Sequence, residues 1–110
     1  MKLEGIIVPL ITPLRMDESL DELGVQRLVE HVIAGGVSGI FILGSSGEGP
    51  MLSMATKERL TRSVSEQAKG RVHVLVGALG VGTRNAIEEA KKLLKLGGDA
   101  VVVTGPYYFT

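Results

Sequence analysis

The chain has 110 residues, which is enough for one domain of ordinary size and leaves no room for a second. Twelve basic residues balance twelve acidic ones, which argues against the cationic surface that nucleic acid or an anionic membrane would select. Cysteine is absent, so disulfides, thiolate catalysis and cysteine-bound metals are excluded. With 45% hydrophobic residues, only 4% aromatic residues and 15 glycines, the composition indicates a globular α/β protein with an aliphatic core and favours a small ligand.

The N-terminal apolar segment, GIIVPLITPL, is short and is interrupted by Pro9 and Pro13, with Glu4 directly before it. A membrane span needs about 20 apolar residues, and a secretory signal needs an unbroken apolar stretch after a basic start. We therefore expect neither a leader nor a transmembrane segment. The absence of cysteine fits a reducing compartment, and we expect a cytoplasmic location.

Runs of β-branched residues alternate with segments of helical periodicity along the chain. A first strand is predicted over residues 6–11. The helix after it should end at Gly35-Gly36, because glycine often follows the last helical turn. Its buried stripe is formed by residues three and four positions apart, namely Val25, Leu28, Val29, Val32 and Ile33. A second strand is predicted over residues 39–43.

The second helix is expected to begin after Ser53 as N-cap, to bury Leu60 and Val64, and to end at Gly70. A third strand follows over residues 72–76, and a fourth over residues 100–104. Between them, the third helix should run from Thr83 to Gly97-Gly98. The pattern turns four of its apolar residues inward, Ile87, Ala90, Leu93 and Leu94. The pattern also gives that helix a solvated charged face made of Glu88, Glu89, Lys91, Lys92 and Lys95.

The predicted order is β-α-β-α-β-α-β, with about 30 residues in each unit, as expected of βαβ crossovers. The strands are apolar along their whole length, which indicates a parallel sheet buried on both faces. A small doubly wound sheet and the first half of a (β/α)8 barrel both fit this order. Length favours the sheet, since a whole barrel takes about 250 residues. The end of the chain just after a strand, at residues 106–110, favours a barrel that is cut.

The stretch GSSGEGP, residues 44–50, joins the second strand to the second helix. Ligands collect at the carboxyl ends of parallel strands, and a glycine-rich turn there lets backbone N–H groups approach a carboxylate or phosphate. Small hydroxyls can add donors and relay protons. The alternative is a tight turn in which glycines supply unusual backbone angles and the serines bond to local amides. Both interpretations stay open from the chemistry of these residues.

Other motifs favour structural roles. Gly77, Gly80 and Gly82 lack the spacing of a dinucleotide-binding loop, and no P-loop lysine follows them. His31 and His73 share no motif, so no metal site is predicted. The Tyr107-Tyr108 pair could fill the core, anchor an interface or donate a proton, and packing is favoured.

Three segments together resemble one family. VPLITPL, GGVSGIFILGSSGEGPMLS and GGDAVVVTGPYY occur in the order and spacing of the dihydrodipicolinate synthase and N-acetylneuraminate lyase family, over essentially the whole chain. The resemblance implies that residues 1–110 are the N-terminal half of a single (β/α)8 TIM barrel with parallel strands. It also implies class I aldolase chemistry, in which pyruvate or a related 2-oxo acid forms a Schiff base with a lysine and no cofactor or metal is used.

The resemblance carries over to individual residues. Ser45 stands at the hydroxyl of the family's proton relay, and Ser46 stands where the 2-oxo acid carboxylate is held. Tyr108 matches the tyrosine that reaches across a subunit interface to complete the relay, which implies a homo-oligomer. Further matches are the turn glycines and the end of the first strand, at Gly44, Gly47 and Thr12. The junction GALGVG differs from the G-x-G that many members show.

The Schiff-base lysine has no counterpart in this chain. The six lysines are predicted at the N-terminus or on helices, whereas this nucleophile must be desolvated and aimed into the site from a strand end. The family places it in the second half of the barrel. We therefore expect an N-terminal part of a lyase or aldolase that is inactive alone. The alternative is a non-catalytic half-barrel that self-associates or binds a small anion.

Overall fold

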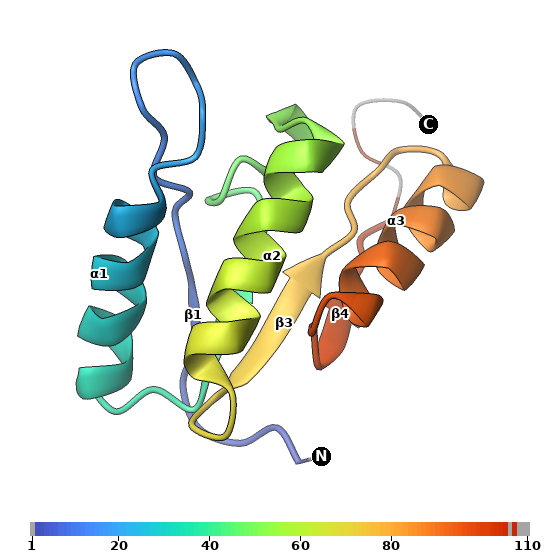
Figure 1. Cartoon of the computed structure of the whole chain (residues 1–110). Helices are drawn as coiled ribbons and strands as arrows, with labels where there is room; N and C mark the ends of the chain where they lie inside the picture. Colours follow the sequence, from blue (N-terminus) through green and yellow to red (C-terminus); the bar gives the residue numbers. More distant parts are fainter. Residues whose placement is uncertain (1, 106, 108–110) are drawn as a thin grey trace.

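The computed structural model describes residues 2–105 and 107, which form four strands and three α-helices in strict alternation (Figure 1). The strands are β1 (Ile7–Pro9), β2 (Gly39–Ile42), β3 (His73–Gly77) and β4 (Ala100–Val102). The helices are α1 (Glu22–Ala34), α2 (Met54–Ala68) and α3 (Thr83–Lys95), with one 3-10 turn at Gly49–Met51. The predicted order is confirmed. Three of the strands, β1, β2 and β4, are shorter than predicted, and β3 begins one residue later.

The sheet decides between the two architectures that the sequence left open. Its order is β1-β2-β3-β4 and every pair is parallel. The three helices lie side by side on one face of this sheet (Figure 1). A doubly wound sheet would reverse its strand order and carry helices on both faces, whereas sequential strands with helices outside them belong to a (β/α)8 barrel. The fold is the N-terminal half of such a barrel.

The helix ends follow from local chemistry. The Asp21 carboxylate accepts a hydrogen bond from the Gly24 amide at 3.0 Å and caps α1. The Ser53 hydroxyl accepts one from the Thr56 amide at 3.2 Å, so its predicted role as the cap of α2 is confirmed. The third helix begins at Thr83 as predicted, although Gly82 stands at its cap position and offers no side chain.

Asp99 fixes the start of β4 beside β3. Its amide donates to the Val74 carbonyl at 2.8 Å, and its carboxylate accepts from the Val74 amide at the same distance. The two bonds hold one residue of β3 from both sides, so the last strand of the sheet is placed before its own short ladder begins.

The core lies between the sheet and the helices. Alternate strand residues face the helices, and Ile40, Ile42, Val74 and Val76 are at most 2% exposed. They pack against buried residues of the helices, namely Val25, Val29, Leu60, Val64 and Leu93. The opposite, inner face of the sheet is only partly covered: Phe41 and Val102 there are half-buried.

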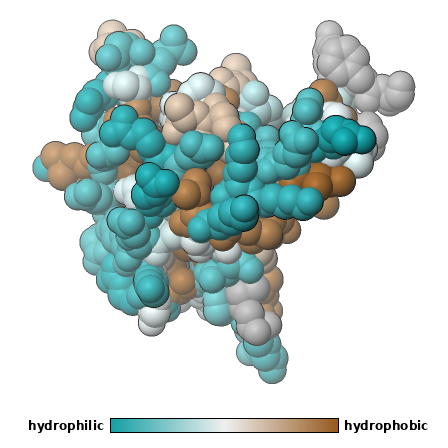
Figure 2. Space-filling view, turned by 45° about the vertical axis from the view of Figure 1, so that its right-hand side comes forward, coloured by the Kyte–Doolittle hydropathy of each residue, from teal (hydrophilic) through white to brown (hydrophobic). Residues whose placement is uncertain are grey.

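The third helix departs from the sequence prediction. Of its four residues expected to point inward, Leu93 is buried and Ala90 is half-buried, whereas Ile87 is 49% and Leu94 41% exposed. These two side chains lie on the flank of α3 beyond β4, where the described chain has no further element. Figure 2 shows apolar side chains exposed along this side of the molecule. The periodicity reported a stripe wider than the sheet beneath it can cover.

Glu89 also departs from the expected solvated face. Its carboxylate accepts a hydrogen bond from Lys57 Nζ at 3.0 Å, and the two side chains are only 12% and 10% exposed. Lys57 lies in the first turns of α2, so the ion pair ties α2 to α3. Such a buried pair adds little net stability over apolar residues of similar volume, but removal of one partner leaves the other charge unpaired.

We expect Lys57→Met to lower the free energy of unfolding by about 3 kcal/mol, because it strands the Glu89 carboxylate. The double variant Lys57→Met with Glu89→Leu should recover most of that loss. Chemical denaturation of the single and double variants measures both values. Equal stabilities of the two variants would contradict the argument.

A second ion pair ties α1 to the turn before β3. Arg71 forms a bidentate pair with Glu30 of α1, and Gln67 donates to the same carboxylate at 2.9 Å. These donors lower the pKa of Glu30 to about 2, with the Arg71 bonds as the main cause. Both side chains are largely exposed, so the contribution to stability is screened by solvent.

A lowered pKa in the folded state stabilises the fold above the pKa of the unfolded carboxyl, about 4.3, and this contribution is lost as the pH falls toward 2. We expect Glu30→Gln to lower the melting temperature at pH 7 and to approach the wild-type value near pH 3. Glu4→Gln is the matched control, since its pair with Lys2 joins no two elements. A Glu30→Gln difference that stays constant with pH would be inconsistent with this linkage.

Among the described residues, no helix combines the length and apolar character needed to cross a bilayer.

Candidate functional site

The parallel sheet brings four connecting segments to one edge. Residues after β1, β2, β3 and β4 all leave the sheet at its carboxyl end, because the strands run in the same direction. These segments contain Thr12, the stretch of residues 44–50, Leu79 and Tyr107. The candidate site is built where they meet.

The loop after β2 turns sharply at Leu43. This residue is fully buried and has a left-handed backbone with φ of 63°, which is uncommon for a side chain other than glycine. The Gly49 amide then donates to the Gly44 carbonyl at 3.1 Å, and the Glu48 amide to the Ser45 carbonyl at 3.0 Å. The chain closes on itself within six residues, and Ser45 and Ser46 are left exposed.

Glycines in this region provide space rather than unusual backbone angles. Gly44, Gly47 and Gly49 are not among the residues with positive φ; the left-handed positions are Leu43 and Glu48. A Cβ on Gly47 would lie 2.9 Å from the Leu10 carbonyl oxygen, and one on Gly44 would lie 2.7 Å from the Phe41 ring. The loop therefore packs against β1 and β2 more closely than any side chain allows.

Gly77 at the end of β3 meets the same turn from the other side. A Cβ there would lie 2.3 Å from the Leu43 carbonyl oxygen and 2.8 Å from its carbon. Both contacts are with backbone, which cannot move aside as a flexible side chain could. The glycine that sequence reasoning placed in a weak nucleotide-binding motif thus has a structural purpose.

Thr12 supports the loop from β1. Its hydroxyl donates to the Gly47 carbonyl at 2.7 Å, and the residue is only 5% exposed. The hydroxyl that sequence reasoning assigned to substrate binding is therefore engaged with the protein's own backbone. Buried hydroxyls normally find such a partner.

A cavity of about 470 Å³ opens at this edge. Its walls combine apolar side chains with three hydroxyls, and its lining is Phe41, Ser45, Pro50, Leu79, Val102, Val103, Thr104 and Tyr107. Ser45 is the one predicted site residue that lines it; Ser46, Gly44, Gly47 and Thr12 lie in or behind the same loop. An apolar cavity with a few convergent polar groups is the usual form of a small-molecule site.

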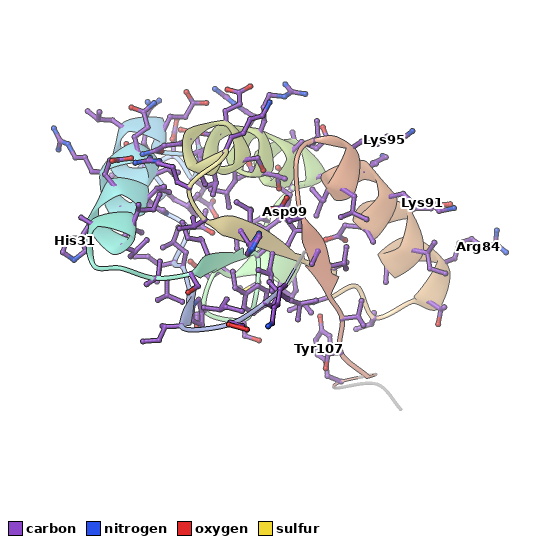
Figure 3. All side chains as sticks on the ribbon, turned by 90° about the horizontal axis from the view of Figure 1, so that it is seen from below. His31, Arg84, Lys91, Lys95, Asp99 and Tyr107 are labelled. Carbon is purple, nitrogen blue, oxygen red and sulfur yellow. The ribbon has the colours of Figure 1, made fainter. Side chains whose placement is uncertain are left out.

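Tyr107 forms one wall of the cavity and was not assigned a site role from the sequence. Its hydroxyl donates to the Leu79 carbonyl at 2.5 Å and so connects the segment after β4 to the loop after β3. Figure 3 shows Tyr107 on the segment that follows β4. Only its position after a strand could have indicated this contact, because the partner is a backbone atom 28 residues away.

The geometry can be compared with known proteins. The sequence pattern of the Dihydrodipicolinate synthetase family matches residues 2–110. The chain belongs to this family. The 4-hydroxy-tetrahydrodipicolinate synthase of Stenotrophomonas maltophilia is 41% identical over 108 residues, 97% of this chain and 36% of that protein. The synthase of the same name from Protochlamydia amoebophila is 35% identical over 98% of this chain and 36% of its own length.

Solved structures agree with the family match. YagE, a prophage protein of the dihydrodipicolinic acid synthase family from E. coli K12 in complex with pyruvate, has 36% identity and a TM-score of 0.90. The match covers 96% of this chain and 36% of that one. The chain thus spans about a third of the length of its dihydrodipicolinate synthetase relatives.

None of the six lysines of this family member lines the cavity. Lys57 is paired with Glu89 between two helices, and Lys69 follows α2 at the opposite, amino edge of the sheet. Lys91, Lys92 and Lys95 lie on α3 and Lys2 near the N-terminus. Tyr108 and Pro106 of the family motif lie outside the described residues. Within those residues, no three acidic, histidine or cysteine side chains gather to hold a metal.

We expect Gly77→Ala to destabilise the protein by about 2 kcal/mol or more and to displace the loop, because its methyl group would overlap the Leu43 carbonyl. Gly105→Ala is the control at the same edge, where a Cβ meets no atom within 4 Å. Denaturation midpoints and the backbone chemical shifts of Ser45 and Ser46 test this. A Gly77→Ala variant as stable as Gly105→Ala would refute the close approach.

Proposed function

We propose that residues 1–110 are the N-terminal half of a single (β/α)8 domain in a lyase or aldolase that forms a Schiff base with pyruvate or a related 2-oxo acid. Family membership and the match to only 36% of each relative support this assignment. The observation that carries it is Ser45, an exposed hydroxyl on the wall of a cavity at the carboxyl edge of the sheet. The pyruvate complex of YagE supports the substrate class.

In this proposal Ser46 and the backbone amides of the loop hold the substrate carboxylate. The Gly44 and Gly47 positions allow the backbone to come close enough, and Thr12 keeps the loop in place through its bond to the Gly47 carbonyl. An anion gains from several N–H donors that need no reorganisation when it binds. The exposed serine hydroxyls leave that end of the loop free for a ligand.

Ser45 would pass a proton between the reacting carbonyl and Tyr108. Schiff-base formation joins a lysine amine to the 2-oxo carbon and expels the carbonyl oxygen as water, so protons must move to that oxygen and away from the nitrogen. A hydroxyl can accept one proton while it donates another. We further propose that Tyr108 completes this relay near a subunit interface of a cytoplasmic homo-oligomer.

The chain alone would be inactive, because the proposed chemistry needs a lysine aimed into the cavity and none of its lysines is. Its 2-oxo acid site would hold a substrate without attacking it. A non-catalytic half-barrel is the second candidate, and the uncovered apolar flank of α3 and β4 favours it.

Reduction with borohydride in the presence of pyruvate should attach the substrate covalently to a full-length barrel that carries these residues, and leave the 110-residue chain unlabelled in mass spectrometry. In the full-length protein, Ser45→Ala should lower turnover by about 100-fold, because a proton-transfer step is lost. Ser46→Ala should chiefly raise the KM for the 2-oxo acid.

Labelling of the 110-residue chain would refute the argument about lysine. Full turnover in Ser45→Ala would refute the relay while leaving the carboxylate site intact. An unlabelled full-length protein would remove Schiff-base chemistry altogether and favour the non-catalytic candidate.

A further inference from the structure

The two outer strands of the sheet each have one side without a partner among the described residues. β1 pairs only with β2, and β4 pairs only with β3. Each therefore presents backbone donors and acceptors that a further strand could use. Both strands run in the same direction, so the free side of β4 can continue the parallel sheet into the free side of another β1.

The shape of the chain sets how many copies such pairing would join. The four strands match the barrel of YagE over 96% of this chain, with a TM-score of 0.90. They occupy 36% of that protein and four of the eight strands of a (β/α)8 barrel. One copy therefore covers half a turn, and a head-to-tail contact that rotates by half a turn closes after two copies rather than growing into a filament.

The inner face of the sheet also needs a second half. Register places Pro9, Phe41, Leu75 and Ala100 across the four strands on one face. Phe41 and Ala100 are only half-buried and Pro9 is exposed. A barrel of eight strands has an interior that side chains from opposite strands just fill. Two copies would supply the two facing halves of this interior.

Apolar side chains are exposed along both free sides. Ile6 and Ile11 flank β1 and are 70% and 60% exposed, and Val103 after β4 is 67% exposed. Beside Val103, a groove of about 280 Å³ runs along α3 and contains Val81 and Ile87. Contiguous exposed apolar surface of this kind marks an interaction site.

The charges of the two sides are opposite. The loop after β1 carries Asp17 and Glu18 against one arginine, Arg15. Figure 3 shows Arg84, Lys91 and Lys95 pointing outward from α3, and Glu88 is the one exposed acidic residue of that helix. The loop after β1 and the N-terminal end of α3 lie at the same end of the molecule (Figure 1). A β1 side therefore attracts a β4 side, whereas like sides repel.

We propose that two copies of the 110-residue chain close into one eight-stranded barrel, in which β4 of each copy pairs in parallel with β1 of the other. The partner is a second copy because one molecule carries both complementary sides and the chain has no net charge to oppose association. The inference does not depend on the proposed activity.

Engineered cysteines test the direction of pairing, since the chain has none of its own. Ile11→Cys lies after the carboxyl end of β1, Val103→Cys after that of β4, and Ile6→Cys before the amino end of β1. A mixture of the Ile11→Cys and Val103→Cys chains, treated with a short bismaleimide, should give cross-linked dimers. The mixture of Ile6→Cys with Val103→Cys is the matched control and should give several-fold fewer, because a parallel pairing keeps these positions about 16 Å apart.

Cross-linking of Ile11→Cys or Val103→Cys chains alone, or preferential cross-linking of Ile6→Cys with Val103→Cys, would overturn the proposed pairing. Sedimentation velocity of the unmodified chain gives a readout that needs no variant. A dimer that weakens as salt rises is expected. A folded monomer with a cooperative melting transition, or an open-ended series of larger species, would refute closure.

Discussion

The backbone turn at Leu43 is the constraint on which the candidate site depends. A buried leucine in the left-handed region sends the chain out of β2 at a steep angle, and its carbonyl then lies against β3. That position is available only because residue 77 has no side chain. The strain of an unfavourable backbone angle at Leu43 is held by tight packing on both sides. The serines reach the cavity edge because their route out of the sheet is fixed before the loop begins.

The molecule divides into a finished side and an unfinished one. Helices seal one face of the sheet with a continuous aliphatic core, and ion pairs at Lys57 and Glu30 lock neighbouring helices and turns together. The inner face and the outer strands carry the remaining apolar surface. The strand ends that build the cavity belong to both sides. A site can therefore be assembled locally while the sheet around it still needs partners.

The sequence was most informative where local chemistry decides the structure. The Ser53 cap, the element order and the position of the GSSGEGP loop all follow from short-range patterns. The failures involve distant parts of the chain. The Thr12 bond to Gly47, the Lys57 pair with Glu89 and the Tyr107 bond to Leu79 join residues 28 to 35 positions apart. Ile87 and Leu94 follow the periodicity of a buried face, but periodicity gives the direction of a side chain and not what lies there.

The hydrogen bond from Thr12 to the Gly47 carbonyl gives the outermost strand a second role. It makes β1, whose other side is free, one of the supports of the ligand loop. Whatever covers that strand will reduce its fluctuations, and the loop will have less entropy to lose when an anion binds. Because such coupling is reciprocal, an occupied loop will also hold β1 more firmly in the position that a neighbouring strand must meet. Sheet completion and ligand affinity are thus thermodynamically linked through a single threonine hydroxyl.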